Sequence, residues 1–141
     1  TPISISYEYD PLDITKAKGW EGWEKLSHEE SNKRDLNELI KGIKGYKGRV
    51  HLHICESIKT NPKNIEELAS QIDNQIISNY RLWPSNYHSA FELGLVNKNY
   101  LEQKELDDLF LKRFNEISTD LKQEVLKIYA APYLNLKKRG Q

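Results

Sequence analysis

The sequence predicts a small α/β fold in which a parallel β-α-β unit is followed by a helical C-terminal region. Residues 2–9 and 49–55 alternate apolar and polar side chains, which is the two-residue period of a β-strand. Between and after these segments, aliphatic residues recur three and four positions apart, as on one face of a helix. We therefore expect one domain over residues 1–141, with the strand–helix–strand unit in 1–58 and helical cover in 59–136.

Residues 2–9 form the first predicted strand, in which Ile3, Ile5 and Tyr7 share one face. Asp10 and Pro11 end this strand. The same two residues are suited to begin a short helix reaching residue 18, because Asp is a good N-cap and Pro fits the first helical position.

The next predicted helix spans residues 32–44, and its apolar face consists of Leu36, Leu39, Ile40 and Ile43. A second strand follows at residues 49–55. A strand–helix–strand order favours a parallel pair with a right-handed crossover, so we expect this helical face to pack on the sheet. Because two parallel strands alone make a poor sheet, we also expect further strands upstream of the chain.

The rest of the chain is predicted to be helical. The predicted helices begin after the caps Asn64, Ser85, Asn99 and Asp120, and the last of them ends at Pro132. Residues 137–141 are polar, and we expect them to be a frayed tail.

The composition excludes several classes of protein. The 21 basic residues balance 21 acidic ones, which argues against a nucleic-acid binder. A single cysteine excludes an internal disulfide framework and a cysteine-built zinc site. No apolar run approaches the ~18 residues of a membrane span. The chain has no methionine and opens directly on a strand, so we expect a fragment of a cytoplasmic protein.

Two histidines on the second strand are candidate metal ligands. His51 and His53 lie two positions apart and so share one face. Cys55 is the only nearby third ligand, so we favour a packed or half-solvated strand face without a metal. His51 with Glu56 also forms a His-x4-Glu pair. A strand places these two residues on opposite faces, and we interpret the pair as chance.

His88 and Glu92 lie four positions apart on a predicted helix and could pair as a general base. No nucleophile or glycine-rich phosphate loop lies near them in the sequence, so a packing or surface pair is the favoured interpretation. Cys55 has no activating partner and is predicted to be a buried apolar group.

Two aromatic residues and a basic tail are candidate contacts for a membrane or a partner. Trp20 and Trp23 could anchor at a membrane interface, against the alternative that they pack in the core. Lys137, Lys138 and Arg139 could contact anionic lipid at ~1 kcal/mol per charge, against the alternative of a solvated tail.

Several segments together resemble the C-terminal half of bacterial 1-acyl-sn-glycerol-3-phosphate acyltransferases. Residues 2–11 (PISISYEYDP) resemble the fourth sequence block of that family, and residues 48–53 (GRVHLH) resemble a later strand. Residues 72–76, 79–87 and 128–132 resemble the following helix, its turn and the end of the fold. The family usually continues the later strand with Phe-Gly-Glu-Pro-Ile, whereas residues 54–58 are ICESI here, without the glycine and proline.

This resemblance implies a glycerolipid acyltransferase that moves an acyl group from coenzyme A or acyl carrier protein to a lysophosphatidate-like acceptor. In that family a His-x4-Asp pair activates the glycerol hydroxyl, and a Glu-Gly-x-Arg block holds the phosphate. Neither block occurs in residues 1–141, so no catalytic residue carries over and the chain alone is predicted to be inactive. The resemblance implies that Pro2, Ile3 and Ile5 form a wall of the substrate cleft, without a cofactor or metal.

The resemblance also implies partners and a location. They are an upstream acyltransferase core and, in the intact protein, a place at the bacterial inner membrane, whose anionic surface the basic tail could contact. A homodimer is expected on different grounds, because the strand at residues 2–9 would have a bare edge; we expect it to form through this strand or through the Trp20/Trp23 segment. The alternative is a stand-alone protein-interaction module without enzymatic activity.

Overall fold

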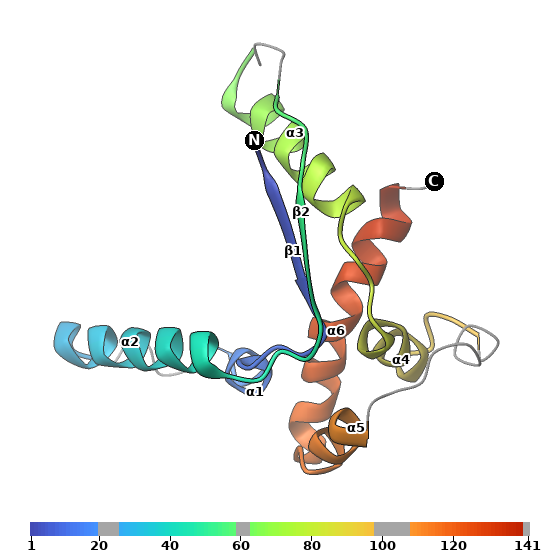
Figure 1. Cartoon of the computed structure of the whole chain (residues 1–141). Helices are drawn as coiled ribbons and strands as arrows, with labels where there is room; N and C mark the ends of the chain where they lie inside the picture. The colour runs from blue at the N-terminus through green and yellow to red at the C-terminus, as the bar shows by residue number, and fades with distance from the viewer. Residues whose placement is uncertain (20–25, 59–62, 98–107, 140–141) are drawn as a thin grey trace.

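The computed structural model describes residues 1–19, 26–58, 63–97 and 108–139. It is a mixed fold, mostly helical, with a small two-stranded sheet (Figure 1). The elements in chain order are β1 (Ile3–Tyr7), α1 (Asp13–Ala17), α2 (His28–Lys44), β2 (Val50–Ile54), α3 (Ile65–Ser78), α4 (Pro84–Glu92), α5 (Asp108–Asn115) and α6 (Thr119–Arg139).

The two strands pair antiparallel, so the predicted parallel β-α-β unit is wrong. After α2, the chain comes back beside the C-terminal end of β1. The Glu8 N–H donates to the Arg49 carbonyl at 3.0 Å, and the Tyr9 N–H donates to the Lys47 carbonyl at 3.0 Å. Because β2 starts beside the end of β1, it has to run back along it.

A glycine permits this return. Gly48 has a φ of +64°, and a Cβ at this position would lie 2.7 Å from the Tyr9 ring. Both the left-handed backbone and the close approach favour glycine over any residue with a side chain. The turn into β2 therefore depends on Gly48.

α2 does not cover the sheet, which corrects a second expectation. It projects from the ribbon as an arm (Figure 1), with its apolar residues Leu36, Leu39, Ile40 and Ile43 all exposed. The helix starts at His28 instead of residue 32, because Ser27 and Glu30 form a capping box.

The core lies where α1, α4, α5 and α6 meet the end of β1. Phe110 of α5 stacks on Tyr9 with ring centroids 5.6 Å apart, and it meets Tyr129 of α6 edge-on at 5.3 Å. Val125 and Ile117 complete this buried cluster. The core thus includes one residue from the end of the sheet segment, three from α5 and α6, and Ile117 from the turn between these two helices.

α4 packs closely on α6 through small residues, including Ser89 and Ala90, which are fully buried. The Asn86 side chain joins the two helices, because its Nδ2 donates to the Tyr129 carbonyl at 2.9 Å. Its Oδ1 accepts from the Trp83 N–H at 2.7 Å. The helix starts at Pro84, and Ser85 is its second residue instead of its predicted cap.

The boundaries of the other helices follow the sequence in part. The predicted cap of α3 is confirmed, because Asn64 Oδ1 accepts from the Glu67 N–H at 2.8 Å. The predicted stop at Pro132 is wrong, since α6 continues through it to Arg139. Proline removes one helical hydrogen bond, and a helix already held by packing can tolerate that loss. The predicted cap Asn99 lies outside the described residues.

Candidate functional site

The two faces of β1 are buried in the opposite sense to the usual pattern. Ser4 and Ser6 are 1% exposed, whereas Ile3 and Ile5 are 49% and 51% exposed. The helices therefore cover the polar side of the ribbon, which we call the inner face. The apolar side remains open to solvent, and we call it the outer face.

The inner face is joined to the helical region by specific hydrogen bonds. Ser4 Oγ donates to the Ile76 carbonyl in α3 at 2.9 Å. Ser6 Oγ accepts from the Arg81 N–H, just after α3, at 3.2 Å. Each serine hydroxyl satisfies a backbone group that the packing of α3 against the strand would otherwise remove from water.

Glu8 extends this polar row and is itself buried. Its carboxylate accepts from Arg49 Nε at 3.0 Å and from Nη2 at 2.7 Å, which is a bidentate pair across the two strand ends. The Glu8 carbonyl accepts from Ser85 Oγ of α4 at 2.7 Å. The Arg49 guanidinium lies 5.1 Å from the centroid of the buried Trp83 ring.

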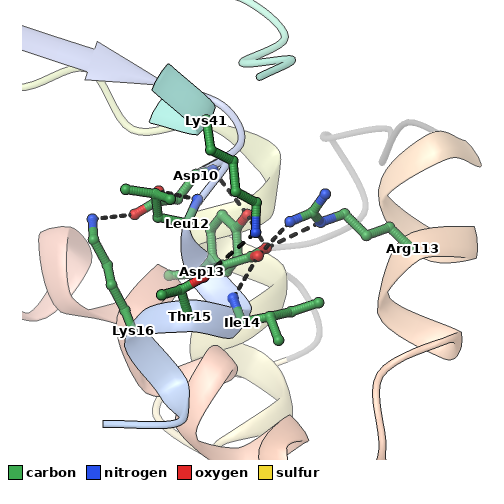
Figure 2. A network of polar contacts seen from close by, with 9 residues as sticks. Asp10, Leu12, Asp13, Ile14, Thr15, Lys16, Lys41 and Arg113 are labelled. Atoms are coloured by element: carbon green, nitrogen blue, oxygen red, sulfur yellow. Dashed lines mark hydrogen bonds and ion pairs between the residues drawn. The ribbon is translucent and has the colours of Figure 1, made fainter. Parts of the chain in front are cut away.

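A second buried carboxylate, that of Asp13 in α1, is the centre of the polar network in Figure 2. Arg113 of α5 donates to it from Nε at 3.1 Å and also from Nη2. The Tyr129 hydroxyl of α6 donates to it at 3.0 Å and accepts from the Asp10 N–H at 3.0 Å. Asp13 therefore joins α1, α5 and α6 to the end of the β1 segment.

The surroundings of this network shift the pKa values of its members. Burial raises the pKa of the Tyr129 phenol, and the Asp13 charge raises it further. The hydrogen bond from Arg113 to Asp13 raises the pKa of the guanidinium, although burial opposes this. The Tyr129 phenol thus stays protonated and Arg113 stays charged around neutral pH.

Asp10 lies at the edge of the network. Its Oδ1 accepts from the Leu12 N–H at 2.9 Å, and its Oδ2 pairs with Lys16 Nζ at 2.5 Å (Figure 2). Burial lowers the pKa of Lys16, but the hydrogen bond to Asp10 and the negative charges of Asp10 and Asp13 together outweigh burial and leave the pKa raised. Both carboxylates are thus engaged by protein groups, and we interpret the network as a structural clamp.

The outer face consists of six side chains in three facing pairs. The pairs are Ile3 with Ile54, Ile5 with Leu52, and Tyr7 with Val50. The five aliphatic members are each about half exposed or more. None of the six side chains carries a charge.

The edges of the ribbon are open as well. The bonds from the Glu8 N–H to the Arg49 carbonyl and from the Cys55 N–H to the Pro2 carbonyl place the even-numbered residues of β1 in the bonded pairs. The main-chain N–H and C=O groups of the outer-face residues therefore point away from the partner strand. Within the described part of the chain, no hydrogen bond to these groups is present.

The exposed stripe of α2 is a second apolar surface. A cleft of about 550 Å³ lies between α1 and α2 and is lined by polar side chains of α2, including Lys33, Arg34 and Lys41. Lys41 Nζ lies 3.4 Å from Thr15 Oγ1 (Figure 2). The polar side of α2 thus faces α1, and the four aliphatic residues point elsewhere.

The predicted site residues are divided among separate elements. Ile3 and Ile5 lie on the outer face, and Pro2 precedes them half-buried. Lys137 and Lys138 are exposed near the end of α6. Trp20 and Trp23 lie outside the described residues, as does the side chain of Arg139. No helix in the described segments is long and apolar enough to cross a membrane.

The histidines predicted as candidate ligands or bases lie in packed positions. His51 and His53 stack with ring centroids 6.4 Å apart, and no metal-binding group of three His, Cys, Asp or Glu occurs among the described residues. His88 packs edge-on against Phe110 and Phe114 at 6.1 and 6.2 Å. Burial lowers the pKa of His88, although Glu92 opposes the shift.

Cys55 and Glu56 adjoin the end of β2. Cys55 is buried, and its thiol lies 3.7 Å from the Gln75 carbonyl of α3. Glu56 is exposed after the strand end. Among the described residues, neither Cys55 nor Glu56 lies beside a phosphate-binding loop.

Sequence reasoning missed the clamp, because its partners are about 100 positions apart in the chain. The one available signal was the charge at Glu8 and Asp10, on the side of the strand that alternation assigned to solvent.

Comparison of the chain with protein-family models, curated proteins and solved structures finds no match in any of the three.

Proposed function

We propose that this chain is the C-terminal, non-catalytic part of a glycerolipid acyltransferase. The proposal starts from the resemblance of residues 2–11 and 48–53 to two strand blocks of bacterial 1-acyl-sn-glycerol-3-phosphate acyltransferases. The intact protein would transfer an acyl group from acyl-CoA or acyl carrier protein to a lysophosphatidate-like acceptor. Its catalytic histidine and phosphate clamp would lie in the acyltransferase core outside residues 1–141.

The observation that carries the proposal is the open outer face. In the resemblance, β1 belongs to the wall of the substrate cleft, beside the catalytic sheet. A wall strand needs one side fixed to its own helices and one side available to the core. The inner face is fixed through Ser4 and Ser6, and the outer face with Ile3 and Ile5 is available.

The open edges support the same proposal. A two-stranded ribbon is marginal by itself, and three or more strands are normally needed for independent stability. Added strands would pair with the outward main-chain groups of β1 or β2. An additional layer would then cover the aliphatic side chains, which is what an acyltransferase core would provide.

The chain alone should release no thiol from acyl-CoA above the buffer rate when lysophosphatidate is present. General-base assistance is worth ~10²–10⁴ in rate, and no base of the His-x4-Asp kind occurs in the sequence. Acceptor-dependent turnover that is abolished by His51→Ala would contradict the proposal, because it would assign the reaction to His51 with Glu56.

The decisive test is the reading frame ahead of Thr1. A His-x4-Asp block followed by a Glu-Gly-x-Arg block in that frame would support the proposal. The longer protein should then transfer acyl groups, and Ile5→Lys should lower its turnover more than Ile65→Lys, since Ile65 is also exposed but lies on α3. A start codon directly before Thr1 would instead favour a stand-alone interaction module.

A further inference from the structure

We infer that the isolated chain of residues 1–141 pairs with a second copy through the outer face, around a two-fold axis. The inference goes beyond the proposed function, because it concerns how the same surface is covered when no acyltransferase core is bound. The surface involved is the six-residue outer face.

The exposed area is sufficient for a weak dimer. The five aliphatic residues of the outer face leave roughly 450 Å² of apolar surface open, which is within the size range of functional patches. Two such faces packed together would bury roughly 900 Å² in total, which is the size of a weak, transient interface.

The outer face is compatible with a copy of itself. A two-fold axis brings identical surfaces together, so a like charge on the face would meet its own image. The outer face has no charged side chain, and the chain as a whole has a net charge of zero. Two sheet faces of aliphatic side chains can interdigitate about 10 Å apart, as they do in a sandwich.

A second protein chain fits this surface better than a lipid membrane does. The outer-face residues expose main-chain N–H and C=O groups at both edges, and hydrocarbon cannot satisfy them. A face-to-face protein pair leaves these edges in water while it buries the aliphatic side chains. Pairing through the edges alone would leave the same aliphatic side chains exposed.

The test is sedimentation equilibrium of the whole chain across the micromolar range. We expect a monomer–dimer equilibrium in which the mass rises from 16.5 kDa towards twice that value. Ile5→Lys should weaken dimerisation at least about tenfold, because the two copies would each bury a charge in the interface. Leu52→Lys, on the facing strand, should weaken dimerisation in the same way.

The control is Ile65→Lys, which places the same charge on an aliphatic residue that is 80% exposed at the start of α3. This variant should dimerise like the unmodified chain. Circular dichroism of all three variants should keep the helical signal, since each replaced side chain is at least half exposed.

Three results would overturn the inference. They are a monomer at every concentration, a dimer that is insensitive to both Ile5→Lys and Leu52→Lys, and a mass that rises beyond two chains. A monomer that binds phosphatidylglycerol vesicles would assign the face to a membrane. The measurement involves no substrate, so its failure leaves the acyltransferase proposal standing, and the absence of acyltransferase blocks upstream would leave the dimer standing.

Discussion

The inner and outer faces of the ribbon belong to the same ten residues but are covered differently. On the inner face, the serine hydroxyls bond to main-chain groups beside them, and Glu8 continues the row with a bidentate pair to Arg49. On the outer face, the aliphatic side chains meet no described element that covers them. The polar face is therefore the one that fixes the ribbon to the helices.

The difference shows what alternation in a strand specifies. Alternation separates two kinds of side chain onto two faces, and it leaves open which face the rest of the chain covers. Hydrogen bonds from Ser4 and Ser6 require particular partners at particular distances. Aliphatic side chains require only an apolar surface, so a different protein chain can supply it.

The largest expected effect is the difference in lost stability between a substitution in the core and one in the stripe of α2. Val125→Asp should prevent folding, because it would place an unpaired charge in a fully buried position, at a cost comparable with the whole stability of a domain. Leu39→Asp should change the free energy of unfolding by no more than about 0.5 kcal/mol in the monomer, since Leu39 is 59% exposed. Urea denaturation at low protein concentration measures both. Equal losses would show that α2 is covered within one chain.

The second effect concerns the clamp. Asp13→Asn should lower the free energy of unfolding by about 2–3 kcal/mol, because the Asp13 carboxylate is buried and bonded to Arg113 and Tyr129. The matched control is Glu124→Gln, which breaks the exposed pair with Lys127 and should cost at most about 1 kcal/mol. A loss for Asp13→Asn no greater than that of the control would contradict the clamp.

The third effect tests a single bond between the ribbon and α4. Ser85→Ala removes the donor to the Glu8 carbonyl and should cost about 1 kcal/mol in the free energy of unfolding. Ser57→Ala removes an exposed hydroxyl after β2, and we expect its cost to stay within about 0.5 kcal/mol. Thermal unfolding of both variants would reveal the difference, and identical melting curves would exclude a role for the Ser85 bond.

The smallest effect is the pH dependence of the helical region. Burial lowers the pKa of His88 in the folded chain, so below the ordinary histidine pKa of about 6.5 the unfolded chain binds more protons than the folded one. The stability from neutral His88 is therefore fully present above the pKa of His88 in the unfolded chain. It is lost as the pH falls through the lower pKa of His88 in the folded chain. His88→Gln should flatten this part of the stability profile. An unchanged profile would show that other groups cause the acid loss.

Much of the local structure could be predicted from the sequence. The two strands, the cap of α3 at Asn64 and the apolar stripe of α2 all occur as local periodicity or capping chemistry indicates. These features depend on residues a few positions apart, whose geometry is set by the backbone alone. The clamp could not be predicted, because Asp13, Arg113 and Tyr129 come from three distant helices.

The sequence by itself determined which side chains share a face, on β1, on β2 and on α2. Only the tertiary structure decided that the strands are antiparallel, that the polar side of the ribbon is buried, and that α2 leaves the sheet open. The reason is that burial depends on which elements meet. The turn at Gly48 returns the chain beside Tyr9. On the inner face, serine hydroxyls and the Glu8 carboxylate bond to main-chain groups and to Arg49, and these bonds offset the loss of hydration on burial.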